Sequence, residues 1–164
     1  MKALKDLMAG NGAHIENSKK PGEPPLPASN LIGNRALGWQ PNADGTFRPL
    51  GTSIGFLLRP RGQDLDNIAL NATNAFDAAQ RRYPTSLPPG TSATTTFSSL
   101  WSEKLIHPTY LERGQQDGRH DVVIKMNGRT MRLVPIHIDH FIGTLDDEEV
   151  PEGDDNAALL GDKE

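Results

Sequence analysis

The sequence predicts a small single α+β domain, because it contains one amphipathic helical pattern at about residues 64–83 and one β-hairpin pattern at about residues 120–135. We expect the hairpin to lie in an antiparallel sheet. The 13 prolines and 16 glycines are concentrated outside the apolar stretches, so part of the chain should lie outside a packed core. We therefore divide the chain into an extended Pro/Gly-rich arm (1–31), an α+β core domain (32–145) and an acidic tail (146–164).

The N-terminal arm begins with a short apolar pattern. Leu4, Leu7 and Met8 fall on one side of a one- or two-turn helix, which is marginal alone and needs a docking surface. Leu4 and Leu7 are therefore candidate partner-binding residues. The stretch Pro21–Pro27 favours an extended, polyproline-like chain. Both a partner-wrapping arm and a disordered leader are compatible with this composition.

The central part of the chain contains predicted strands and the strongest helical pattern. A turn cluster at residues 41–45 could join short strands at Trp39 and Phe47, and residues 53–59 are typical of a buried strand. Asp64 can cap the predicted helix, Pro84 ends it, and residues 97–106 could form a second, short helix. The apolar stripe of the main helix comprises Leu65, Ile68, Ala69, Ala72, Phe76, Ala79 and Tyr83.

The predicted β-hairpin turns at Asn127-Gly128, a pair that favours a type I′ turn because both positions need a positive φ. Closing the strands on this turn places Ile124 opposite Met131, Val123 opposite Arg132 and Val122 opposite Leu133. Continued alternation would bury His137 and Asp139 and expose two isoleucines, which is unfavourable. We therefore expect a bulge or strand break at Val134-Pro135.

Composition restricts the compartment and the chemistry. The absence of cysteine excludes disulfides, thiolate nucleophiles and cysteine-ligated metal sites. The N-terminus is too short and too charged for the core of a signal peptide, and no run of residues is apolar enough for a membrane span. We expect a cytoplasmic protein or one that lies inside a virion assembled there, with no membrane partner.

Charge is distributed unevenly along the chain. The net charge of −4 combines 16 basic and 12 acidic residues up to Leu145, a net +4, with one lysine and nine acidic residues after it, a net −8. A solubilising disordered tail and a partner-binding peptide both fit the C-terminal composition. For the second alternative, Leu159 and Leu160 are the candidate partner-binding residues.

His137, Asp139 and His140 form the one cluster of histidine and acid that suggests chemistry. In a strand, His137 and Asp139 share a face while His140 points away, so local geometry supplies two metal ligands at best. A histidine–aspartate pair could act as a general base, but no motif such as G-x-S-x-G supplies a nucleophile. We assign no catalytic, metal or cofactor-binding residue and expect no cofactor.

A nucleic-acid surface is a further alternative, with Arg81, Arg82, Lys125, Arg129 and Arg132 as its candidate residues. The net charge of +4 over the first 145 residues is modest for a dedicated nucleic-acid-binding protein.

These observations favour a non-catalytic structural or assembly component of a larger complex, of the kind found among phage virion or packaging accessory proteins. Its expected partners are other protein subunits, and the composition also allows homo-oligomerisation. One alternative is a nucleic-acid-binding protein regulated by its acidic tail. Another is an enzyme or metal-binding protein that uses His137, Asp139 and His140.

Overall fold

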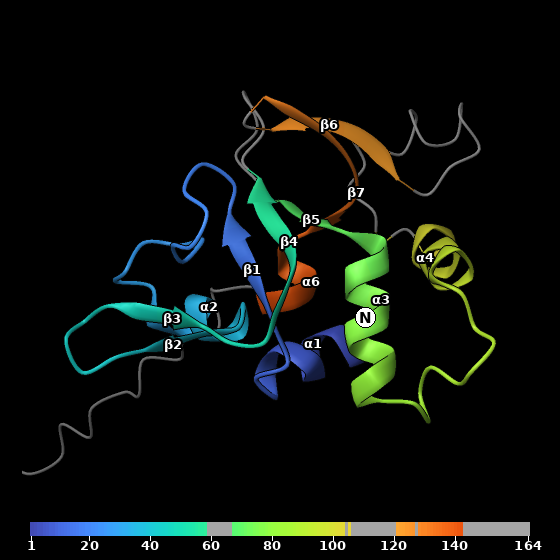
Figure 1. Ribbon diagram of the computed structural model, residues 1–164, viewed down its shortest axis with the longest axis horizontal. Helices are drawn as coiled ribbons and strands as arrows, with labels where there is room; N and C mark the ends of the chain where they lie inside the picture. Colours follow the sequence, from blue (N-terminus) through green and yellow to red (C-terminus); the bar gives the residue numbers. More distant parts are fainter. Residues whose placement is uncertain (59–66, 104, 106–120, 127, 143–164) are drawn as a thin grey trace, which may run out of the picture.

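The computed structural model describes residues 1–58, 67–103, 105, 121–126 and 128–142. These residues form the predicted α+β domain (Figure 1). None of the helices in the described ranges is long and apolar enough to cross a bilayer. The elements run in the order α1 (Lys2–Ala9), β1 (Ala13–Asn17), α2 (Leu31–Ala36), β2 (Trp39–Pro41), β3 (Phe47–Pro49), β4 (Thr52–Leu58), β5 (Asn67–Leu70), α3 (Ala72–Arg82), α4 (Ala93–Ser102), β6 (Val122–Met126), β7 (Arg129–His137) and α6 (Asp139–Ile142).

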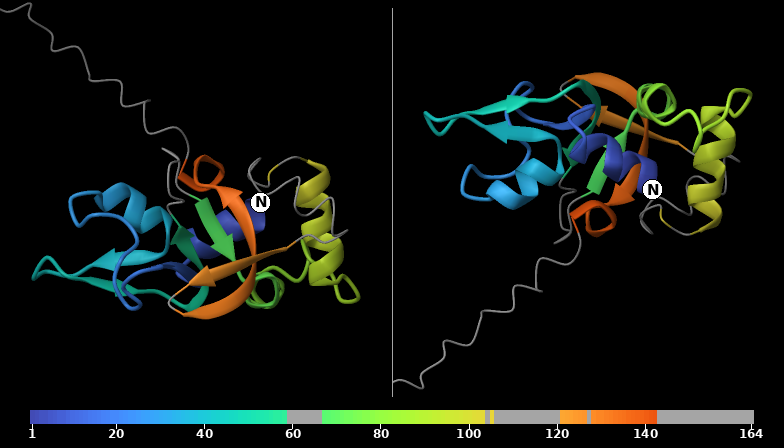
Figure 2. Two further views of the ribbon diagram at one scale, coloured as in Figure 1. Left: turned by 90° about the horizontal axis from the view of Figure 1, so that it is seen from above. Right: turned by 90° about the horizontal axis from the view of Figure 1, so that it is seen from below.

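The central sheet has five strands in the order β1-β4-β5-β7-β6. Strand β1 runs parallel to β4, whereas the other neighbours are antiparallel, so the sheet is mixed and the prediction of an antiparallel sheet is wrong at this edge. The parallel pair arises because the chain returns from β1 to β4 through α2 and the separate β2–β3 hairpin, a crossover connection. Figures 1 and 2 show this hairpin at one end of the molecule and α3 and α4 at the other.

The first 17 residues belong to the folded body. Helix α1 contacts α3 and buries Leu4, Leu7 and Met8, while Ile15 of β1 is fully buried. The extended arm predicted for residues 1–31 therefore starts only after Asn17. The short helix packs against α3 of its own chain, which supplies the contacts that a helix of this length needs. Leu4 and Leu7 therefore lie in the core and not on a partner-binding surface.

The helix predicted over residues 64–83 is shorter than expected. Residues 67–70 form the central strand β5, and α3 begins at Ala72 with the Asn71 side chain accepting a hydrogen bond from the Asn74 amide at 3.0 Å. Ile68, Ala69 and Leu70 are completely buried between two neighbouring strands, an environment that overrides a helical pattern. The predicted cap Asp64 lies outside the described residues.

The C-terminal hairpin has the predicted register, with Val122 opposite Leu133 and Ile124 opposite Met131. The predicted break at Val134-Pro135 is wrong, because β7 continues to His137. No change of phase is required, since residues 133–136 are buried on both faces of the sheet. Pro135 lies beyond the last residue paired with β6, so β7 is an edge strand on that side and tolerates a residue without an N–H group.

Candidate functional site: a groove beside the proline-rich segment

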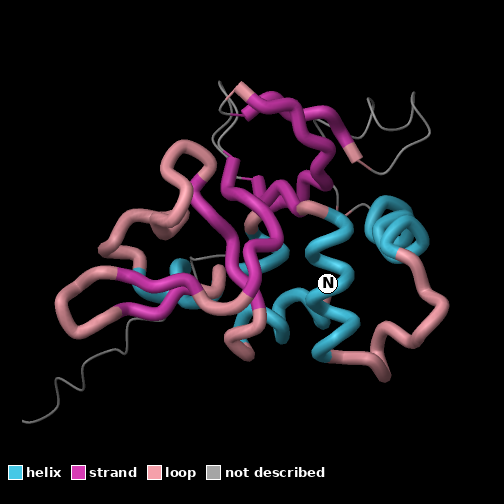
Figure 3. Tube along the Cα trace, viewed as in Figure 1, coloured by secondary structure: helices cyan, strands magenta, loops and turns pink. Residues whose placement is uncertain are grey.

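A surface cavity of about 660 Å³ lies between the connection from β1 to α2 and the β2–β3 hairpin. One side is formed by residues 17–20 and 22–28, the other by Gly45, Thr46 and Phe47, and Leu57 of β4 also lines it. We call this cavity the proline groove because Pro24, Pro25 and Pro27 line it. Figure 3 shows the long loop between β1 and α2 that forms its first side.

Asn17 fixes the start of this loop. Its side-chain oxygen accepts hydrogen bonds from the Lys19 and Lys20 amides at 2.9 and 3.2 Å. Its side-chain amide donates to the Pro24 carbonyl at 3.5 Å, which links the start of the loop to the proline-rich segment. This arrangement is an Asx-type turn, in which an asparagine side chain replaces a backbone partner.

Asn34 fixes the end of the loop from within α2. Its side chain is fully buried and its oxygen accepts a hydrogen bond from the Leu26 amide at 3.1 Å. Its nitrogen donates to the carbonyls of Leu26 and Pro27 at 3.2 and 3.1 Å. The side chain therefore gives the segment the hydrogen bonds that a neighbouring strand would otherwise supply.

Two features restrict the conformation of the groove wall. Each proline has a fixed φ, and the segment is bonded to the body through Asn17 and Asn34. A binding surface that is already ordered loses less conformational entropy when a ligand docks. The loop thus has the extended, proline-rich character expected of an arm, but it is part of the folded domain.

The opposite side of the groove is held against β1. Trp39 of β2 is buried and donates from Nε1 to the Ile15 carbonyl at 2.7 Å. His14 Nδ1 lies 3.0 Å from the Leu50 carbonyl, and its Nε2 lies 3.7 Å from a carboxylate oxygen of Glu16. Gly38 has a φ of +84°, and a Cβ there would collide with the backbone of Ala13. These contacts hold the β2–β3 hairpin against β1 and so fix the position of one side of the groove relative to the other.

The groove combines an apolar lining with a charged rim. Leu26, Phe47 and Leu57 supply apolar surface. Lys19 and Lys20 are exposed at the rim, and the Lys20 ammonium lies 3.3 Å from the Glu23 carboxylate. Such an exposed ion pair is weak and can exchange for another carboxylate. The groove therefore suits a peptide segment that carries both apolar and acidic side chains.

The predicted His137, Asp139 and His140 cluster lies where β7 passes into α6. His137 Nδ1 is 3.2 Å from a carboxylate oxygen of Asp139, and the rings of His137 and His140 are 6.3 Å apart. Burial lowers the pKa of His140, and the nearby His137 lowers it further. Among the residues that the structure describes, no group of three or more histidine and acidic side chains is placed to hold a metal ion.

Asn67 of β5 lies directly opposite His137. Its side chain is fully buried, and neither its oxygen nor its nitrogen has a hydrogen-bond partner within the described part of the chain. The sequence does not single out Asn67, because it predicts a helix over this segment and the structure has the strand β5 there.

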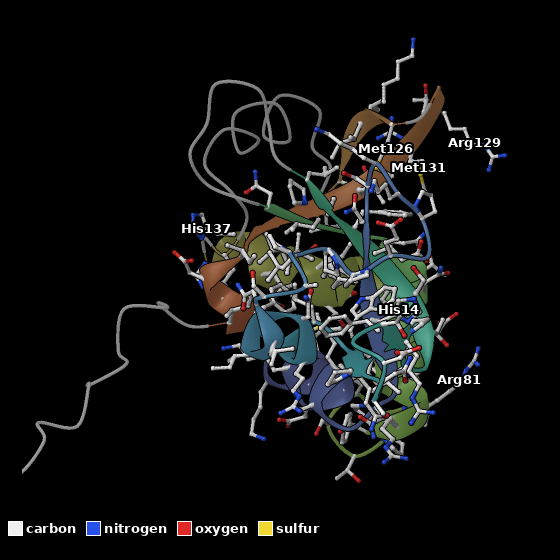
Figure 4. The ribbon with its side chains drawn as sticks, turned by 90° about the vertical axis from the view of Figure 1, so that its left-hand side faces the viewer. His14, Arg81, Met126, Arg129, Met131 and His137 are labelled. Carbon is white, nitrogen blue, oxygen red and sulfur yellow. The ribbon has the colours of Figure 1, made fainter. Side chains whose placement is uncertain are left out.

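The predicted nucleic-acid-binding residues form two separate groups. Arg81 and Arg82 end α3, whereas Lys125 and Arg129 lie on the β6–β7 hairpin. Figure 4 shows Arg81 and Arg129 far apart. Arg132 is bonded to Asp121 at 2.9 Å. The structure thus does not bring the five residues together, and binding of nucleic acid stays a prediction.

Among the residues predicted to bind partners, Leu4 and Leu7 are buried in the core, and Leu159 and Leu160 lie outside the described residues. The residues that build the proline groove, above all Asn17, Asn34 and Phe47, were not predicted. The one sequence signal that could have indicated them is the presence of an asparagine on either side of a proline-rich segment.

The chain matches no protein-family model, no curated protein and no solved structure.

Proposed function

We propose that this protein is a non-catalytic component of a larger protein assembly and that it binds a partner subunit through the proline groove. The single observation that carries the proposal is the anchoring of the groove wall by the buried Asn34 side chain. Burying an amide is favourable only when it is hydrogen-bonded, and here its bonds hold an otherwise irregular segment in one conformation. A groove that is ordered in this way is suited to binding.

The surface next to the groove supports the same proposal. Leu31 and Ile32, in the first turn of α2, are 47% and 64% exposed and follow the groove wall by a few residues. Exposed apolar side chains that lie next to each other favour contact with another protein. A phage virion or packaging complex is the class of assembly that we propose to test first.

A cross-linking experiment tests the proposal, because the chain contains no cysteine and one can be introduced at a chosen position. Ala28 is exposed and lines the groove, whereas Thr73 is exposed on α3 at the other end of the molecule. A photoreactive label on Ala28→Cys should cross-link a protein from the native host or particle, and the same label on Thr73→Cys should not.

The captured protein is then purified and its affinity is measured directly. Ala28→Arg, which fills the groove, should weaken binding by about tenfold or more, the equivalent of about 1.4 kcal/mol. Thr73→Arg is the matched control and should leave the affinity unchanged. Equal labelling from both positions, or an affinity that Ala28→Arg does not change, would show that the groove is not the binding site.

A further inference from the structure

The C-terminal end of the described domain lies close to the proline groove. Helix α6 ends at Ile142 and contacts α2. Helix α2 in turn starts three residues after Ala28, the last residue of the first side of the groove. The chain that follows Ile142 therefore starts near the element that continues the groove wall.

The length of this following chain is sufficient to reach the groove. Ala157 is 15 residues beyond Ile142. Fifteen residues span at most about 50 Å when extended, and about 20 Å as a random coil. A domain of this size has a radius of gyration of roughly 14 Å, which is less than either of these distances, so the segment can reach the groove. A tether of this length gives an effective concentration of about 1 mM, so even a weak contact is populated.

The sequence of this segment complements the groove. Ala157–Leu160 is an apolar run, with Asp154 and Asp155 before it and Asp162 after it. The groove has an apolar lining that includes Phe47 and Leu57, and its rim has two ammonium groups, Lys19 and Lys20, against the one carboxylate of Glu23. Apolar side chains and flanking carboxylates thus meet apolar surface and ammonium groups.

We infer that the proline groove binds the acidic C-terminal segment of its own chain, with Leu159 and Leu160 on the apolar lining and the flanking carboxylates beside Lys19 and Lys20. The inference rests on the proposed function, because the segment occupies the site that the partner needs. The C-terminal segment then competes with the partner, and a partner must present similar apolar and acidic residues or bind more tightly.

The energetics fit a contact that can be displaced. Burying two leucines contributes roughly 1.5–3 kcal/mol each at most, and ordering the segment offsets much of this gain. Exposed ion pairs add little and are screened by salt. The contact should therefore depend on the tether and weaken as the salt concentration rises.

Disulfide trapping in the full chain tests the inference. Ala28→Cys combined with Ala158→Cys places one thiol at the groove and one in the apolar run, and Thr73→Cys combined with Ala158→Cys is the control. We expect the intramolecular disulfide of the groove pair to form about tenfold faster or more, by virtue of the local concentration of the thiols. Adding Lys19→Glu and Lys20→Glu to the groove pair should lower its rate, because the reversed charges repel the flanking carboxylates.

A second measurement does not depend on disulfide chemistry. A labelled peptide of residues 146–164 is titrated into the wild-type chain and into Leu159→Ser/Leu160→Ser, whose own segment no longer competes. The double variant should bind the peptide about twofold or more tightly. Equal affinities, equal rates of disulfide formation for the two cysteine pairs, or disulfides that form only between two molecules would each overturn the inference.

The cross-linking and disulfide-trapping results together distinguish a failure of this inference from a failure of the proposed function. If the partner cross-links through Ala28→Cys while the groove pair traps no faster than the control, the groove binds a partner but not its own C-terminal segment. If the partner fails to cross-link as well, both are wrong.

Discussion

The Asn34 side chain is fully buried and makes three hydrogen bonds to the groove wall, so Asn34→Ala tests directly what these bonds contribute to stability. The change removes three hydrogen bonds, two to Leu26 and one to Pro27. Pro27 is exposed, so water can replace the bond to its carbonyl. The amide and carbonyl of the half-buried Leu26 lose their partner, at about 1–3 kcal/mol for each group that stays unpaired.

We expect Asn34→Ala to lower the free energy of unfolding by about 3 kcal/mol, which corresponds to a decrease in Tm of roughly 10 °C for a domain of this size. Urea denaturation, followed by the fluorescence of the two tryptophans and by circular dichroism, measures the difference. Asn34→Asp keeps the shape of the side chain but turns a carboxylate toward two carbonyl groups, so it should destabilise the protein at least as much at neutral pH.

Asn42→Ala is the matched control, because this asparagine also donates from its side chain, to the Thr46 hydroxyl at 2.9 Å, but is exposed. Its effect should stay below about 0.5 kcal/mol. The reasoning is refuted if Asn34→Ala is no more destabilising than Asn42→Ala, or if Asn34→Asp is as stable as the wild type.

Three further predictions concern the supports of the groove and the histidine cluster. Gly38→Ala should destabilise the protein by several kcal/mol more than Gly45→Ala, because both glycines have a positive φ but only a Cβ at Gly38 meets other atoms. An equal decrease in the free energy of unfolding for the two variants, measured by urea denaturation, would contradict this. Trp39→Phe should cost about 1–3 kcal/mol, since the buried Ile15 carbonyl loses its donor, and a thermal melt that matches the wild type would count against that bond. Because the pKa of His140 is lowered from its ordinary value of 6.5, its unfolded form binds more protons, so its contribution to stability is complete above that value and is lost as the pH falls through the folded pKa. His140→Gln should therefore reduce the loss of stability measured by urea denaturation between about pH 7.5 and 5, and an unchanged pH dependence would exclude this role.

Local signals predicted those parts of the fold that depend on neighbouring residues. The residues Asn127-Gly128 determined the register of the β6–β7 hairpin, which the structure confirms. The turn at residues 41–45 likewise predicted the β2–β3 pair. In both cases the partner strands are adjacent in sequence, so the turn alone determines which residues face each other.

Long-range pairing decided the parts that the sequence did not reveal. Residues 67–70 fit either a helical or a strand pattern, and their position between β4 and β7 selects the strand. Nothing near Ala13–Asn17 indicates a parallel partner more than thirty residues later. Asn34 is equally difficult to interpret, because asparagine is common in turns and its role depends on a segment eight residues earlier.

The position of β7 between β5 and β6 has a consequence for the order of events during synthesis. Strand β4 is complete at Leu58, but β5 gains its second neighbour only when His137 has been made. At about 5–20 residues per second, the ribosome needs roughly 4–16 s to cover this interval. Until then β5, whose apolar residues are completely buried in the finished domain, lacks one neighbouring strand, so released chains that stop before Leu133 should depend on chaperones more than the full chain does.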